Sequence, residues 1–101
     1  MIQIAIVKTD KAERLMKALC NHFNRKRTAR YEGDKGYINF GDGKCELTAT
    51  PAELRFQAEA EQAEGLDHVK QAVEKHLMRF TPEDNYQLLW REPSGDKEFL
   101  A

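Results

Sequence analysis

Residues 28–60 read TARYEGDKGYINFGDGKCELTATPAELRFQAEA, and their pattern sets the architecture of the chain. Apolar side chains recur at every second position in three consecutive segments, with polar side chains between them. The apolar positions are Ile38 and Phe40, then Cys45, Leu47 and Ala49, then Leu54, Phe56, Ala58 and Ala60. A period of two is typical of strands whose sheet has one apolar face and one polar face.

Turn-forming residues separate these segments at the right places. Residues 33–36 read GDKG and residues 41–43 read GDG, which contains the Asp-Gly step that tight hairpins favour. Pro51 interrupts the chain before the last segment. Together, the alternation and the turns predict a four-stranded antiparallel meander.

An amphipathic helix is predicted on either side of the meander. Asp10 and Glu13 have the spacing of a capping box, so the first helix is expected to begin at Asp10. Its apolar stripe consists of Ala12, Leu15, Met16, Leu19 and Phe23. The stripe of the second helix consists of Leu66, Val69, Val73, Leu77 and Phe80. Thr81 and Pro82 are expected to end the second helix.

Alternating segments at residues 2–7 and 86–91 add a strand at each end of this series. The predicted order is therefore strand, helix, four strands, helix, strand (β-α-β-β-β-β-α-β). This order indicates an α+β fold, a two-layer sandwich in which both helices pack on one face of a mainly antiparallel sheet. Residues 1–92 are expected to form a single domain, and residues 93–101 a flexible C-terminal tail.

Composition and charge exclude several classes of function. The chain has 101 residues, 41% hydrophobic and 33% charged, with a formal net charge of −1. This near balance argues against nucleic acid or an anionic membrane as a partner. No stretch is long enough to span a bilayer, and the amino-terminal strand lacks the basic region of a signal peptide. Its two cysteines, Cys20 and Cys45, form no C-x-x-C pair, so we expect a cytoplasmic protein with reduced thiols.

Two histidines are the candidate metal ligands. His22 and His76 hold corresponding edge positions on the two helical stripes, so both imidazoles are expected to face the seam between the helices. With Cys45 rising from the sheet below, they would offer ligands for zinc, copper or iron. The structural alternative is that each histidine hydrogen-bonds a backbone carbonyl or a carboxylate. Cys20 is expected to be a buried small hydrophobe, and His68 to be exposed on the far side of the second helix.

Arg25, Lys26 and Arg27 form the one basic cluster, a candidate anion patch. Cations at a helix C-terminus are also explained by the helix dipole alone. Residues 41–44 (GDGK) do not form a phosphate loop, because Ile38 stands at the position of the leading glycine and Cys45 at that of the hydroxyl side chain. Ser94 is the only serine, which argues against a serine nucleophile, and a Cys45–histidine couple would lack an orienting group.

Several motifs in order resemble a known bacterial family. The motifs are residues 19–23 (LCNHF), 36–40 (GYINF), 44–47 (KCEL), 76–80 (HLMRF) and Trp90. Over about residues 9–91 the chain resembles domain-of-unknown-function family 2218, with matching positions at Cys20, His22, Phe23, Cys45, His76, Phe80 and Trp90. The resemblance implies a small bacterial protein, some of whose relatives are associated with siderophore and iron-uptake genes. It assigns no catalytic residue.

Three hypotheses of different classes follow. The first is a non-enzymatic module that binds a small ligand, a metal complex or a protein partner, with its site at His22, Phe23, His76 and Phe80. Iron or siderophore handling is its most concrete form, and it rests on the resemblance. The second is a protein-interaction or self-association module, for example a homodimer formed through an open sheet edge and the exposed Tyr37. The third is a small enzyme dependent on a metal or on a cysteine and a histidine.

Overall fold

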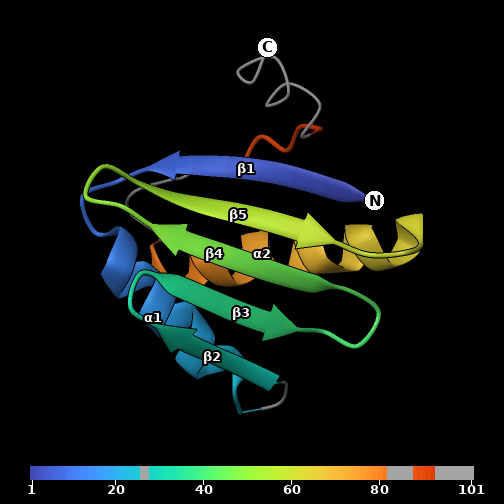
Figure 1. Cartoon of the computed structure of the whole chain (residues 1–101), viewed down its shortest axis with the longest axis horizontal. Coiled ribbons are helices and arrows are strands. Elements are labelled where there is room, and N and C mark those ends of the chain that lie inside the picture. Colours follow the sequence, from blue (N-terminus) through green and yellow to red (C-terminus); the bar gives the residue numbers. More distant parts are fainter. Residues whose placement is uncertain (26–27, 82–87, 93–101) are drawn as a thin grey trace.

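The computed structural model describes residues 1–25, 28–81 and 88–92. Its elements are β1 (Ile2–Lys8), α1 (Ala12–Phe23), β2 (Thr28–Glu32), β3 (Lys35–Asn39), β4 (Lys44–Ala49), β5 (Glu53–Glu59) and α2 (Ala63–Phe80). The strands form one antiparallel sheet in the order β1-β5-β4-β3-β2, and both helices cover one of its faces (Figure 1). The predicted α+β fold and the meander are confirmed.

The register of the strands explains why the period of two makes a core. Leu47 on β4 lies opposite Phe56 on β5 and Gly36 on β3, so the apolar side chains of neighbouring strands share the face beneath the helices. Leu47 and Phe56 are fully buried. The helical stripes fill the other half of the same core, where Met16, Leu19, Val69, Val73 and Leu77 are each at most 1% exposed.

The first helix does not begin as the sequence suggested. Lys11 is the N-cap residue, and no side chain caps the helix. The Thr9 hydroxyl instead accepts a hydrogen bond from the Lys11 N–H at 3.0 Å. The side chain that holds this turn therefore belongs to Thr9, one residue before the predicted Asp10. Glu13 forms an ion pair with Lys17 at 2.8 Å, one helical turn ahead. The predicted capping box of Asp10 and Glu13 is therefore wrong, because local turn geometry placed the helix start after Asp10.

The predicted closing strand is reduced to one bridge in the part of the chain that the structure describes. Ile4 and Arg91 exchange backbone hydrogen bonds of 2.8 and 2.9 Å on the outer side of β1. Residues 86 and 87 lie outside the described residues, as does the predicted tail 93–101. Trp90 packs against the core, and its indole N–H donates to Glu74 of α2 at 2.6 Å. This segment therefore ties β1 to α2.

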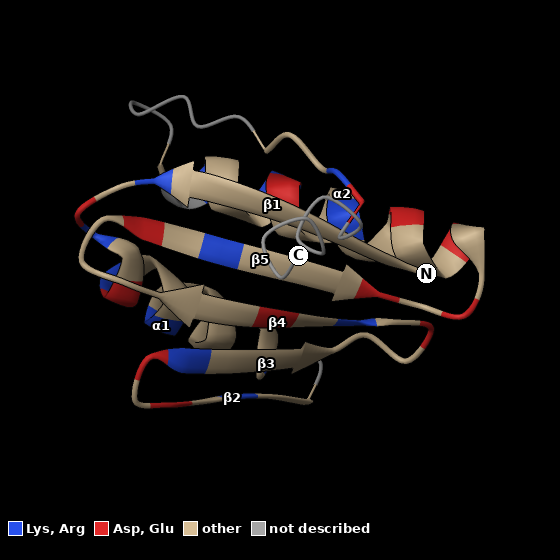
Figure 2. Ribbon diagram, turned by 45° about the horizontal axis from the view of Figure 1, so that its top comes forward, with Lys and Arg blue, Asp and Glu red and all other residues tan. Residues whose placement is uncertain are grey.

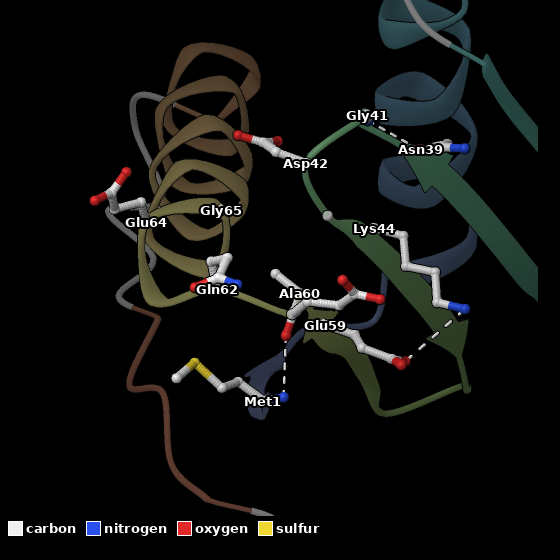
Figure 3. Close-up of a pocket in the computed structure, with 12 residues that line it drawn as sticks. Met1, Asn39, Gly41, Asp42, Lys44, Glu59, Ala60, Gln62, Glu64 and Gly65 are labelled. Carbon is white, nitrogen blue, oxygen red and sulfur yellow. Dashed lines mark hydrogen bonds and ion pairs between the residues drawn. The ribbon is translucent and has the colours of Figure 1, made fainter.

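Two glycines let the start of α2 lie directly against the β3–β4 hairpin. A Cβ on Gly43 would lie 2.7 Å from the Val69 side chain, and a Cβ on Gly65 would overlap the carbonyl oxygen of Asp42. Such close backbone approach requires glycine. It places Asp42 beside the first turns of α2 (Figure 3), where His68 reaches it.

Among the described residues, no helix is long and apolar enough to cross a membrane. The outward face of the sheet carries charges of both signs, interspersed along β3, β4 and β5 (Figure 2). Lys35, Glu46 and Arg55 are examples from the three strands. This is the polar face that the alternation predicted.

Candidate functional site

A pocket of about 590 Å³ opens between the two helices at one end of the sheet. Its lining residues are His22, Phe23, Arg25, Phe40, His68, Gln71, Ala72, Lys75 and His76. They come from the end of α1, the chain just after β3, and the middle of α2. The volume lies in the range of sites for small organic ligands. We call it the interhelical pocket.

The spacing of residues along α2 shapes one side of this pocket. His68, Ala72 and His76 are four residues apart, so their side chains project from neighbouring positions on one side of the helix. Ala72 has no atom beyond Cβ, and it separates two half-buried imidazoles. The result is a recess between the two rings.

Five rings form a continuous aromatic wall from α1 to α2. The centroid of His76 lies 4.6 Å from that of His22 and 4.6 Å from that of Phe23. Phe23 meets Phe40 edge-on at 5.1 Å, and Phe40 meets His68 at 5.8 Å. Because Phe23 and Phe40 are buried in the core, the wall has a rigid apolar base with imidazoles at its ends.

Hydrogen bonds select the tautomers of two imidazoles. Nδ1 of His76 lies 2.7 Å from the carbonyl oxygen of Ala72, which can only accept, so Nδ1 carries the proton and donates it. Nδ1 of His68 lies 2.9 Å from both carboxylate oxygens of Asp42 and donates to them in the same way. Nε2 is therefore the nitrogen of His68 and of His76 that is left for a ligand.

Positive charge dominates the rim of the interhelical pocket. Arg25 and Lys75 are exposed there, and no aspartate or glutamate is among its described lining residues. Cations without opposing carboxylates attract anionic ligands, most strongly at low ionic strength. Of the predicted anion patch, Arg25 belongs to this rim, whereas Lys26 and Arg27 lie outside the described residues.

The structure brings together most of the predicted ligand site. His22, Phe23 and His76 line the interhelical pocket, and the facing of both imidazoles into the seam agrees with their helical phase. The side chain of Phe80 lies outside the described part of the chain. His68 was expected on the far side of α2 and exposed; its side chain is partly exposed, but it lines the interhelical pocket, so the expected position is wrong. Eight residues of helix rotate by about 80°, so His68 stays close enough in angle to His76 to share the pocket.

Neither cysteine joins this site. Cys45 is 1% exposed in the core between sheet and helices and does not line the interhelical pocket. Burial raises the pKa of the Cys45 thiol far above its ordinary value, and burial also raises that of Cys20. Within the described ranges, no three histidine, cysteine or acidic side chains are grouped to hold a metal ion. The expected grouping of His22, His76 and Cys45 is thus absent from those residues, because Cys45 is enclosed by the apolar core.

A second depression, of about 690 Å³, lies at the start of α2 (Figure 3). Its charged lining residues are Asp42, Lys44, Glu59, Glu61 and Glu64. The amine of Met1 also lines it and donates to the Ala60 carbonyl at 3.0 Å, while Lys44 lies 3.9 Å from Glu59. Carboxylates at a helix N-terminus stabilise the helix and need no ligand. We therefore take the smaller interhelical pocket, with its aromatic wall and unopposed cations, as the candidate site.

The fold and the pocket together define a small two-layer α+β domain with a recess between its helices. The chain belongs to the family described as "Uncharacterized protein conserved in bacteria (DUF2218)", whose model matches residues 4–91. The predicted resemblance is confirmed by this match. The solved NMR structure of PA4090 from Pseudomonas aeruginosa is similar, with a TM-score of 0.77 and 28% sequence identity. The similarity covers 89% of this chain and 94% of PA4090. No curated protein matches the chain.

Proposed function

We propose that this protein is a non-enzymatic cytoplasmic module that binds a small, flat, anionic ligand in the interhelical pocket. The observation that carries the proposal is the joining of an aromatic wall to two cations, with no carboxylate among the described lining residues. A ligand with an aromatic body and a carboxylate or phenolate group matches both features.

The recess over Ala72 supports a flat ligand. The two imidazoles that flank Ala72 present Nε2 atoms, which accept from a hydroxyl group when neutral and donate to an anion when protonated. Arg25 and Lys75 at the rim supply the charge that a carboxylate requires. Aromatic hydroxy acids fit this description. They are the iron-binding groups of one class of siderophore, which connects the pocket with the iron-related hypothesis from the sequence.

The test is a titration of the labelled protein with 2,3-dihydroxybenzoate, followed by NMR chemical shifts. We expect shifts confined to the residues that line the interhelical pocket. Ala72→Leu fills the recess without changing charge and should abolish binding. Lys75→Gln should weaken binding by up to about 5-fold, because it removes one of two exposed rim cations. Lys11→Gln, an equal change of charge on an exposed residue at the start of α1, should leave binding unchanged. Equal binding by Ala72→Leu and the wild type would overturn the proposal.

A transition metal is the second candidate ligand, and one observation favours it. Metal-binding histidines commonly donate their second ring N–H to a carbonyl or carboxylate, as His76 does to Ala72. The His22 ring is 4.6 Å from the His76 ring, so both could contribute to one ion with water or a ligand completing its shell.

Metal content of the protein purified without a histidine tag tests this second candidate. Stoichiometric metal that is lost in both His22→Ala and His76→Ala would support it. His68→Ala is the matched control, because the His68 ring contacts Phe40 and Asp42. Metal-free protein whose two variants are only less stable would show that both histidines are structural.

A further inference from the structure

Strand β2 ends the sheet on the side away from β1 (Figure 1). It has five residues, Thr28–Glu32, and all of them except Ala29 are exposed. The opposite edge differs, because Ile4 on β1 is bridged to Arg91. A terminal strand offers backbone N–H and C=O groups to another strand.

The register of the β2–β3 hairpin shows which backbone groups point outward. Glu32 pairs with Lys35 across a two-residue turn, so these two residues exchange hydrogen bonds. Every second residue of β2 then bonds toward β3, as Glu32 does. The N–H and C=O groups of the residues between them, Ala29 and Tyr31, point away from β3. The Ala29 N–H confirms this direction, since it donates to the Asn24 side chain at 3.4 Å. Tyr31 therefore presents its N–H and C=O at the sheet edge.

We propose that two copies of this chain associate through antiparallel pairing of their β2 strands, with Tyr31 of each copy on the two-fold axis. The two Tyr31 residues would exchange two backbone hydrogen bonds across the axis. The same register places Arg30 of each copy opposite Glu32 of the other. One strand thus supplies both halves of the interface, as a two-fold contact requires.

Side-chain charge selects this register over its neighbour. If the strands slipped by two residues, Arg30 would face Arg30 of the second copy, and like charges directly opposite are destabilising. With Tyr31 on the axis, two Arg–Glu pairs form on the polar face of the sheet. Tyr31 lies on the helix side, where the Lys17 ammonium is 5.8 Å from its ring centroid. Since the paired segment is short, we expect association that strengthens with protein concentration and not a permanent dimer.

Sedimentation equilibrium across a range of protein concentrations tests the pairing. Arg30→Glu places two carboxylates opposite each other in each cross-strand pair, and Glu32→Arg places two cations opposite each other. The association constant of each variant should therefore be at least about 10-fold lower than that of the wild type. An equimolar mixture of the two variants should recover association, because every pair is then of opposite sign. The double variant R30E/E32R should also recover it. Arg14→Glu, on the exposed surface of α1, is the matched control and should associate like the wild type.

Some results would overturn the proposal. A wild type that stays monomeric at millimolar concentration would do so. So would variants that associate normally, or a mixture that stays as weak as its components. Arg30→Glu also removes the contact in which the guanidinium lies 5.6 Å from the Tyr37 ring centroid, so its folding is checked by thermal melting. Glu32→Arg leaves that contact in place and tests the register independently. Ligand binding in the interhelical pocket is not expected to change in any of these variants.

Discussion

Gly65→Ala is the substitution that most directly tests how α2 is seated on the sheet. Gly65 is the third residue of α2, and alanine is intrinsically favoured over glycine in a helix interior by about 1 kcal/mol. If Gly65 were exposed to solvent, Gly65→Ala would therefore raise the stability of the protein. Here the added Cβ would overlap the carbonyl oxygen of Asp42 and lie 3.3 Å from the Cβ of Ala60. A backbone oxygen cannot rotate away, so the start of α2 must move off the hairpin.

The expected magnitude follows from these opposing effects. Overpacking of a close contact costs about 1–3 kcal/mol, and more where backbone atoms must shift. Movement of α2 also separates His68 from Asp42, a half-exposed pair that contributes at most about 1 kcal/mol. After the helix-propensity gain is subtracted, Gly65→Ala should lower the free energy of unfolding by about 1–3 kcal/mol. For a domain of this size, that corresponds to a decrease in Tm of roughly 5–20 °C.

Urea unfolding followed by the fluorescence of Trp90, the single tryptophan, measures this change. The control is a pair of variants at an exposed position of the same helix, Gln71→Ala and Gln71→Gly, where alanine should be the more stable by about 1 kcal/mol. The NMR signals of the His68 ring should also change in Gly65→Ala. A Gly65→Ala protein as stable as the wild type, or more stable, would refute the close packing of α2 on the hairpin.

Three further predictions concern the buried cysteines. A Cβ on Gly36 would lie 2.9 Å from the Cys20 sulfur, so Gly36→Ala should lower the free energy of unfolding by about 1–2 kcal/mol. Adding Cys20→Ala should recover part of that loss, and strictly additive effects in a double-mutant cycle would contradict the contact. Burial raises the pKa of the Cys45 thiol, so a thiol reagent should label Cys45 quickly only after unfolding. The Cys20→Ala variant, in which Cys45 is the remaining cysteine, allows this measurement. Rapid labelling of the folded variant would restore the cysteine-enzyme hypothesis. Because the folded state keeps the Cys45 proton that the unfolded state releases, stability should be intact below pH about 8.5 and fall above it. The slope from this thiol is up to about 1.4 kcal/mol per pH unit. In alkaline unfolding curves the loss should be smaller in Cys45→Ala, where only the buried Cys20 thiol remains.

The sequence predicted the candidate site only for those side chains whose direction follows from their angular position around one helix. The phases of His22 and His76 relative to their apolar stripes placed both rings in the seam, and the structure puts them 4.6 Å apart. His68 was misplaced although its helical phase lies only about 80° from that of His76, and what the sequence could not show is its contact with Asp42, a residue of a distant hairpin. Cys45 was correctly placed on the helix side of the sheet, yet strand alternation does not say which side chains cover it.

The sequence by itself determined the strand alternation, the two apolar stripes and the one-sided sheet, because these depend on the 2-residue and 3.6-residue periods of local backbone geometry. Only the tertiary structure decided that β1 pairs with β5, that β2 is left at the edge, and that Thr9 turns the chain into α1. It also decided the offset of α2 along the sheet, through the contact of Gly65 with the hairpin. That offset brings His68, Phe40 and Lys75 to one pocket. Periodicity specifies which direction a side chain points, whereas the position of one element along another is set by close packing between residues far apart in the chain.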